Sequence, residues 1–196
     1  MMSRTAAIKR QTKETTISIK LDLDGGGTYQ VDTGIGFFNH MLELLSRHSL
    51  IDLYIKAEGD LYTDEHHTVE DVGIVLGQAL RQALGDKRGI ERYGFLLPMD
   101  ESLVETAIDL GGRSYLIWNA PFQREKIGDL PTELLKDFFE ALADNLQANI
   151  HINVRYGRNE HHMAEAIFKS FARSLRFAVS RDERLLNFLP STKGTL

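Results

Sequence analysis

Apolar and polar residues alternate along two similar stretches of the chain. In TISIKLDLD (16–24) every second residue is apolar, which is typical of a strand with one face in a core. The same period of two returns in VETAIDL (104–110). Glycines follow each stretch, and TYQV and RSYLIW then resume an apolar pattern. We therefore predict two hairpins that turn at Gly25–Gly27 and at Gly111–Gly112, with the second strand returning along the first.

The same three elements follow each predicted hairpin. Apolar residues spaced three and four apart predict a helix over 37–47 and another over about 68–84. In the second half this spacing predicts a helix after Thr132, a suitable N-cap, and a last helix from about Met163. Between the two helices of each half, an apolar run predicts one more strand, LIDLYIKAEG (50–59) and IHINVRYG (150–157).

The repeated order of elements indicates an internal duplication. LDLDGGGTYQV (21–31) resembles IDLGGRSYLI (108–117). A repeat of roughly 90 residues is too long for a solenoid unit. We predict an α+β fold made of two half-domains, each a mostly antiparallel sheet with helices on one face. Residues 8–87 form the first half-domain, residues 88–190 the second, and residues 191–196 a C-terminal tail.

Composition and charge narrow the classes of function. The net charge of −5 argues against a general nucleic-acid binder. The chain has no Cys, which excludes disulfides, thiolate metal sites and a thiol nucleophile. No apolar run approaches the ~20 residues of a membrane helix, and MMSRTAAIKRQTKETT lacks the apolar core of a secretory signal. We expect a cytoplasmic protein that has neither a membrane nor a nucleic acid as its partner.

One motif occurs in both halves: His-His-x-x-Glu, as His66-His67-x-x-Glu70 and as His161-His162-x-x-Glu165. A helix advances about 100° per residue, so each motif aims two imidazoles and a carboxylate into a sector of about 100°. A single His at a helix start is more often a polar cap or a surface residue. Repetition at equivalent positions of a duplicated unit favours metal binding.

The remaining histidines suggest how many ligands are present. Four of the seven His lie in the pairs, His40 and His151 precede them, and only His48 is left over. Two sites of about three His and one Glu each would follow. Imidazole and carboxylate without thiolate suit Mn, Fe, Co, Ni or Zn, and open positions would admit substrate or water. The ligands could be shared across a subunit contact, which would link metal binding to oligomerisation.

Several cations and carboxylates lie outside the motif. Alone, each of Arg92, Arg113 and Lys169 is an ordinary surface charge or an anion clamp. The tail STKG (191–194) offers hydroxyls, a cation and a glycine turn, which is the chemistry of a phosphate cradle. Glu14 and Glu101 precede strands in equivalent places, and near a divalent ion either could act as general acid or base, with Asp100 competing with Glu101.

Together these motifs resemble imidazoleglycerol-phosphate dehydratase over nearly the whole chain. The stretches that carry the resemblance are GIGFFNHMLELLSRHS (34–49), DEHHTVEDVGIVLGQAL (64–80), ERYG (91–94), PMDESL (98–103), DLGGR (109–113) and HHMAEAIFKSFARSLR (161–176). The resemblance implies a fold related to the second domain of ribosomal protein S5. It also implies removal of water from D-erythro-imidazole-glycerol phosphate, which gives imidazole-acetol phosphate in histidine biosynthesis.

The resemblance further implies a cofactor, an assembly and roles for single residues. Two Mn²⁺ ions per active site are expected, in a 24-subunit homo-oligomer of cubic symmetry with its sites at subunit interfaces. The implied metal ligands are His40, His66, His67, Glu70, His151, His161, His162 and Glu165. The implied substrate contacts are Glu14, Arg92, Arg113, Lys169, Ser191 and Lys193. Glu14, which would reach a neighbour's site, is the expected proton shuttle, and Glu70 and Glu165 complete the catalytic carboxylates.

Two rival hypotheses come from other classes. A non-catalytic His-rich oligomer that stores metal would explain the His pairs, but not the Arg and Lys set. A small-molecule kinase on the same duplicated fold would need a phosphate loop, and no GK[ST] follows Gly25–Gly27.

Overall fold

The computed structural model describes residues 4–191, with side chains everywhere in that range except at 94–96 and 185. The elements run in chain order as β1 (Thr5–Gln11), β2 (Thr15–Asp22), β3 (Tyr29–Asp32), α1 (Gly36–Ser49), β4 (Asp52–Gly59), α2 (His66–Leu84), β5 (Tyr93–Met99), β6 (Ser102–Asp109), β7 (Tyr115–Asn119), β8 (Lys126–Ile127), β9 (Leu130–Pro131), α3 (Glu133–Leu146), β10 (Asn149–Tyr156), α4 (Glu160–Val179) and the short 3₁₀ helix η1 (Glu183–Leu185).

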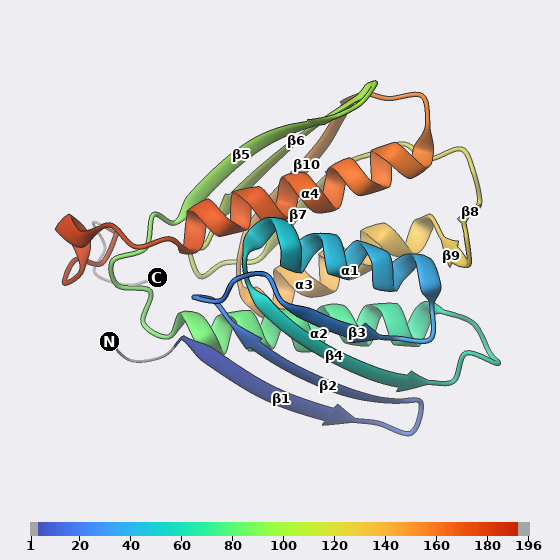
Figure 1. Cartoon of the computed structure of the whole chain (residues 1–196), viewed down its shortest axis with the longest axis horizontal. Helices are drawn as coiled ribbons and strands as arrows, with labels where there is room; N and C mark the ends of the chain where they lie inside the picture. Colours follow the sequence, from blue (N-terminus) through green and yellow to red (C-terminus); the bar gives the residue numbers. More distant parts are fainter. Residues whose placement is uncertain (1–3, 192–196) are drawn as a thin grey trace.

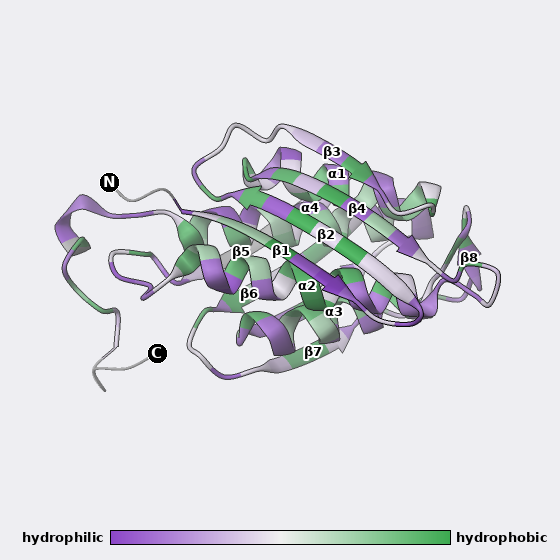
Figure 2. Cartoon of the chain, turned by 90° about the horizontal axis from the view of Figure 1, so that it is seen from below, coloured by the Kyte–Doolittle hydropathy of each residue, from purple (hydrophilic) through white to green (hydrophobic). Residues whose placement is uncertain are grey.

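Two four-stranded sheets enclose the four α-helices (Figure 1). The strand orders, β1-β2-β4-β3 and β5-β6-β10-β7, are equivalent in the two halves. α1 and α2 pack on the first sheet and α3 and α4 on the second, while α2 meets α3 and α1 meets α4 between the halves. Figure 2 shows the first sheet from outside, with helices only behind it. The predicted α+β fold, with helices on one face of each sheet, is confirmed.

The predicted hairpins were wrong in their pairing. β3 pairs with β4 in parallel, and β7 pairs in the same way with β10. A parallel pair needs a crossover, and α1 and α3 provide it. The connection from β2 to β3 therefore passes the start of β4. There Asp52 Oδ1 accepts the N–H groups of Gly26 and Thr28 at 2.9 and 2.8 Å. Alternation in the sequence identified strands without identifying their partners.

The helices begin together at one end of the molecule (Figure 1). A short loop fixes one of these ends, since Asp129 accepts the N–H groups of Gly36 and Phe37 at the start of α1. The first turns of α1, α2, α3 and α4 thus face the same region. Within residues 4–191, none of the helices is long and apolar enough to cross a membrane.

A buried aromatic cluster and a glycine contact hold the helices in place. Phe38 of α1 lies 5.4 Å from Phe138 of α3, and Phe138 lies 5.5 Å from Phe168 of α4, measured between ring centroids. Such pairs contribute about 0.5–1.5 kcal/mol each beyond their buried area. Between α2 and α3 the backbones approach closely at Gly77, where a Cβ would lie 2.8 Å from the Leu142 carbonyl oxygen. The helices are therefore packed tightly against one another, which fixes the relative positions of their first turns.

Candidate metal centre

The second His pair lies in the first turn of α4. The helix begins at Glu160, earlier than predicted, because Asn159 is its N-cap and accepts the backbone N–H of His161 at 3.0 Å. His161 and Glu165 are one turn apart and their side chains meet, with Nε2 and Oε1 separated by 3.4 Å. The motif therefore forms the face that its spacing predicted.

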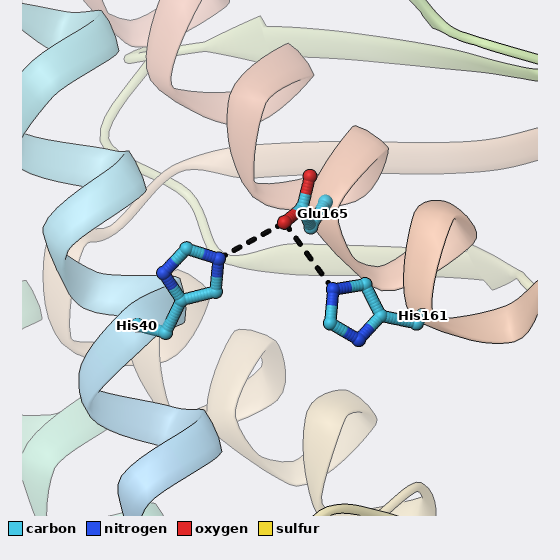
Figure 3. Close-up of side chains that lie close together, drawn as sticks. All are labelled: His40, His161 and Glu165. Atoms are coloured by element: carbon cyan, nitrogen blue, oxygen red, sulfur yellow. Dashed lines mark hydrogen bonds and ion pairs between the residues drawn. The ribbon is translucent and has the colours of Figure 1, made fainter.

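His40 joins this pair from α1. Its Nε2 lies 2.9 Å from Oε1 of Glu165, so one carboxylate oxygen contacts both imidazoles (Figure 3). One ligand atom from each of His40, His161 and Glu165 lies within 4.8 Å of the others. Three of the expected ligands, from two helices and both halves of the chain, are thus brought together. We name His40, His161 and Glu165 the α4 cluster.

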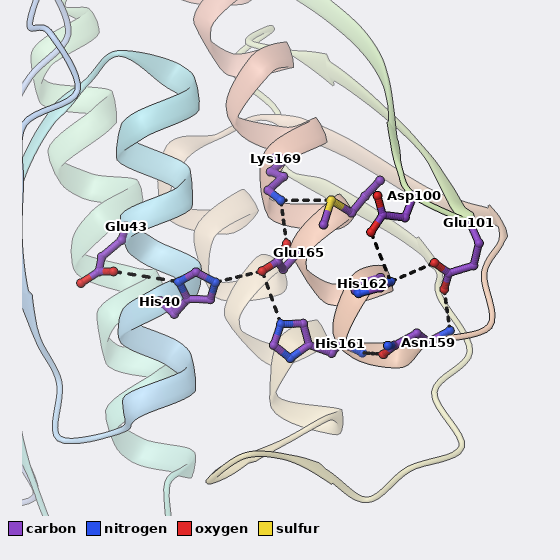
Figure 4. Close-up of polar contacts among 10 residues, drawn as sticks. His40, Glu43, Asp100, Glu101, Asn159, His161, His162, Glu165 and Lys169 are labelled. Carbon is purple, nitrogen blue, oxygen red and sulfur yellow. Dashed lines mark hydrogen bonds and ion pairs between the residues drawn. The ribbon is translucent and has the colours of Figure 1, made fainter.

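Glu165 is held as a carboxylate in a mostly buried place. Its residue surface is 8% exposed, and its Oε2 accepts a hydrogen bond of 2.6 Å from Lys169 Nζ. Burial opposes the charged form, but the bonds from Lys169 and His40 outweigh it and lower the pKa of Glu165 to about 2. Lys169, an expected substrate contact, is engaged here with Glu165 (Figure 4). A bound cation would replace the Lys169 ammonium as the positive partner of this carboxylate.

His162 points to a different partner. Its Nδ1 lies 2.8 Å from Glu101 Oε2, and the other oxygen of Glu101 accepts the backbone N–H of Asn159 at 2.8 Å (Figure 4). The bond with His162 is the main cause that lowers the pKa of Glu101 to about 2, and the same bond raises the pKa of His162. Glu101 is therefore bonded to the start of α4 through both of its oxygens.

The first His pair opens α2 and is more exposed. The helix begins at His66, two residues before the predicted start, and Asp64 accepts the His66 backbone N–H at 2.9 Å. His67 Nδ1 lies 3.1 Å from both oxygens of Asp60, which raises the pKa of His67, and its Nε2 lies 3.9 Å from Glu14. Glu70 is exposed. Here the motif is formed without a closed cluster around it.

The sequence reasoning missed Asp137, a carboxylate beside this first pair. Its Oδ2 lies 3.8 Å from Nδ1 of His66. Asp137 is the fifth residue of α3, as His40 is the fifth of α1, and the two helices are equivalent in the duplicated fold. Aligning FFNHM (37–41) with LLKDF (134–138) would have found it, but a search for repeated His could not. We name His66, Glu70 and Asp137 the α2 cluster, in which His66 and Asp137 are the pair in contact.

His151 joins neither cluster within the chain. It lies on β10 opposite Ala107 and Ile117, and its neighbours Ile150 and Ile152 are buried. Alternation along the strand therefore turns His151 to the outer face of the second sheet, away from the helices, where it is exposed. Its expected role as a ligand stays a prediction that the geometry of one chain does not support.

Of the expected phosphate contacts, Arg92, Arg113 and Ser191 lie at the opposite end of the molecule, whereas Lys169 lies beside Glu165. The Arg92 backbone N–H bonds Ala178 O, near the end of α4, at 2.8 Å. Ala178 is seventeen residues after His161, roughly 25 Å along the helix. Arg92 Nη1 also donates to Pro190 O, next to Ser191, at 2.9 Å. The turn before Arg113 is anchored at the end of α3, where Gly112 N–H bonds Gln147 O at 3.1 Å. Lys193 lies outside the described residues.

The two clusters fit a divalent ion by the chemistry of their donors. Both offer imidazole nitrogens and carboxylate oxygens without sulfur, the set that suits Mn, Fe, Co, Ni or Zn. The α4 cluster needs only small side-chain rotations, since its three ligand atoms already lie within 4.8 Å. The positive ends of four helices oppose a cation there, and the carboxylates of each cluster offset them.

Comparison with known proteins identifies relatives over the whole chain. The family described as imidazoleglycerol-phosphate dehydratase matches residues 33–175. The imidazoleglycerol-phosphate dehydratase of Acidiphilium cryptum is 58% identical over 196 residues, which covers all of both chains. The histidine biosynthesis bifunctional protein HisB of Spirosoma linguale is 55% identical over 194 residues, 99% of this chain and 50% of that protein. The crystal structure of the Staphylococcus aureus dehydratase superposes with a TM-score of 0.82 at 40% identity, over 91% of this chain and 99% of that one.

Proposed function

The chain belongs to the imidazoleglycerol-phosphate dehydratase family, a family of hydro-lyases in histidine biosynthesis, and from this premise we infer a metal-dependent reaction. The substrate is D-erythro-imidazole-glycerol phosphate and the product is imidazole-acetol phosphate. The observation that carries the metal dependence is the convergence of His40, His161 and Glu165, from α1 and α4, on one point. The cytoplasmic location expected from the sequence stays a prediction.

Two divalent ions, Mn²⁺ by the resemblance, are held per active site by the two clusters. His40, His161 and Glu165 hold one, and His66 and Glu70 hold the other. His67 and His162 complete the sets across a subunit contact. For the eighth ligand the chain offers the expected His151 and the neighbouring Asp137, and the 3.8 Å approach of Asp137 to His66 favours the carboxylate. When bound, the ions supply positive charge that stabilises anionic character on the substrate's imidazole ring.

The separation of the expected contacts supports a site shared between chains. Arg92 lies roughly 25 Å along α4 from the His pair, far more than a three-carbon phosphate ester can span. Arg92, Arg113 and Ser191, together with the expected contact Lys193, therefore bind the phosphate of a substrate whose ring lies at the clusters of another copy. A homo-oligomer of 24 subunits with sites at its interfaces satisfies this requirement.

Glu14 moves the proton. Glu70 and Glu165 are occupied as ligands, and Glu101 is bonded to His162 and Asn159. The Glu14 side chain is 55% exposed and lies 3.9 Å from His67 at its nearest charged atom. Its exposure allows it to turn towards substrate held by a neighbour.

Removal and return of the metal test this function. Protein treated with a chelator should lose dehydration of the phosphate ester, and added Mn²⁺ should restore both turnover and the large particle in size-exclusion chromatography. A storage protein would assemble on Mn²⁺ without turnover. Turnover that survives complete removal of metal, verified by elemental analysis, would contradict the metal dependence.

A further inference from the structure

We propose that Asp60 and Glu101 are positioning residues, which hold His67 and His162 in the tautomer that leaves Nε2 free to bind an ion. Neither carboxylate belongs to the expected ligand set. This role rests on the proposed metal-dependent function. It explains how the second His of each pair, His67 or His162, is oriented to bind an ion.

Glu101 fixes His162 through two bonds. A carboxylate can only accept hydrogen bonds, so the 2.8 Å contact with Glu101 Oε2 requires the proton on Nδ1 of His162. The other oxygen of Glu101 accepts the Asn159 N–H at 2.8 Å, which ties the β5–β6 turn to the N-cap of α4. Glu101 is therefore itself anchored, and it sets the direction of the His162 ring.

Asp60 does the same for His67. Both of its oxygens lie 3.1 Å from Nδ1 of His67, and its side chain is only 12% exposed. Nε2 points the other way, towards Glu14 at 3.9 Å. The proton of a neutral ring at this position belongs on Nδ1, and the lone pair on Nε2 faces the exposed end of the molecule.

The two carboxylates come from different parts of the duplicated unit. Glu101 lies in the turn between β5 and β6, whereas Asp60 lies in the connection between β4 and α2. By the internal alignment the counterpart of Glu101 is Glu14, which makes no such bond. The corresponding connection before α4, Gly157–Asn159, contains no carboxylate. A carboxylate at Nδ1 of the second His therefore occurs in both halves, although it comes from different connections. This recurrence is expected if the bond is required.

The physical role follows from imidazole chemistry. A neutral imidazole carries one proton, and only the other nitrogen can bind an ion. Carboxylates bonded to the far nitrogen orient metal-binding histidines, and their loss typically costs about 10–100-fold in metal affinity. Without Asp60 or Glu101, part of the population would carry the proton on Nε2, and the ring would turn more freely.

The test reads the tautomer in the metal-free protein and the affinity in a titration. Solid-state NMR of ring-¹⁵N-labelled histidine, above the imidazole titration range, should show Nδ1 protonated in His67 and His162. His67→Gln and His162→Gln assign the two signals by their loss. In Glu101→Ala and Asp60→Ala the matching ring should show both tautomers, and Mn²⁺ affinity by calorimetry should fall about 10–100-fold.

Two neighbouring carboxylates provide matched controls. Asp100 Oδ2 lies 3.9 Å from Nδ1 of His162, too far for a hydrogen bond, and its side chain is 68% exposed. Asp100→Asn removes this charge, and Asn tolerates the positive φ of 46° at that position. Asp64→Asn keeps the cap on the His66 backbone N–H and removes a charge near His67. Both controls should keep the wild-type tautomers and affinity.

The two measurements distinguish a failure of the positioning role from a failure of the proposed metal-dependent function. Wild-type rings protonated on Nε2, or Ala variants with unchanged tautomer and affinity, would overturn the positioning role. If Glu101→Ala does not fold, Glu101→Gln, which keeps the shape but loses one acceptor oxygen, takes its place with the same expected shift. A wild-type protein that binds no Mn²⁺ refutes the proposed function through the titration, and the NMR spectrum still decides the tautomers.

Discussion

The α2 and α4 clusters begin equivalent helices with the same motif, yet they offer a metal ion different surroundings. At α4, Glu165 is 8% exposed and bonded to His40 and Lys169. At α2, Glu70 is exposed, and the residue four positions later, equivalent to Lys169, is Ile74. The duplication kept the backbone and the His pairs, while the surrounding charges diverged.

The two clusters differ in their net charge and in how closely their ligands are gathered. With neutral histidines, the α4 cluster and Lys169 carry one negative and one positive charge. The α2 cluster carries two carboxylates, Glu70 and Asp137, and no equivalent lysine. A cation therefore meets more negative charge at the α2 cluster but finds its ligands already gathered at the α4 cluster. Equal motifs need not give equal affinities.

The largest expected effect comes from neutralising the two equivalent carboxylates. Glu165→Gln should abolish turnover and lower the free energy of unfolding of the metal-free protein by about 3 kcal/mol, because Lys169 keeps a mostly buried charge without its partner. Glu70→Gln should also abolish turnover but change stability by less than about 0.5 kcal/mol, since Glu70 is exposed. Urea denaturation measures the stability of both variants. Equal losses of stability would contradict the difference between the two sites.

The packing beneath the clusters differs as well. Gly77→Ala should cost about 2 kcal/mol, because its Cβ would lie 2.8 Å from the Leu142 carbonyl oxygen and push α2 from α3. The equivalent residue of α4, seven positions after Glu165, is Ala172, which is buried. Ala172→Gly should cost only about 1 kcal/mol. Thermal unfolding compares the two, and a tolerated Gly77→Ala would show that the α2–α3 contact can relax.

The next effect concerns the eighth ligand. Asp137→Ala should weaken Mn²⁺ binding at the α2 cluster at least about tenfold, or about 1.4 kcal/mol, while leaving binding at the α4 cluster unchanged. His151→Ala is the matched control, because its side chain lies on the outer face of the second sheet. Calorimetric titration of both variants decides the matter. Loss of an ion only in His151→Ala would restore the expectation from the sequence.

The smallest effect is on pH dependence. The pKa values of His67 and His162 are raised by Asp60 and Glu101, so these pairs stabilise the metal-free protein fully below 6.5, the ordinary pKa. That stability is lost as pH rises through the raised values. The metal-loaded protein should behave oppositely, because its ligands must lose their protons. Melting temperatures with and without Mn²⁺ should therefore change in opposite directions with pH, and parallel curves would contradict the assignment of both rings.

Periodicity in the sequence predicted the elements that carry the site. The alternating runs gave β2 and β6, and the 3.6-residue spacing gave the four helices, because each of these elements buries one regular face. β1 was missed because it lies at the edge of its sheet and buries only Ala6, so it has no alternating apolar pattern. The partners of β3 and β7 depend on crossovers through α1 and α3, which local pattern does not encode.

The candidate site was predictable only where a rare residue repeats. The His pairs are visible in the sequence because His is uncommon and the spacing recurs. Asp137 is one carboxylate among many, and only its place in α3, opposite His40 in α1, distinguishes it. The distance between Arg92 and the His pair is also invisible in the sequence, because it follows from the length of α4.

Anomalous X-ray scattering tests the central claim most directly. Crystals of the protein grown with Mn²⁺ and measured at the manganese absorption edge should show two peaks per chain. One should lie within bonding distance, about 2.2 Å, of His40, His161 and Glu165, and the other of His66 and Glu70. Each should also touch His67 or His162 of a neighbouring copy. Crystals of full-length protein that still dehydrates its substrate, with no peak at either cluster, would contradict the account.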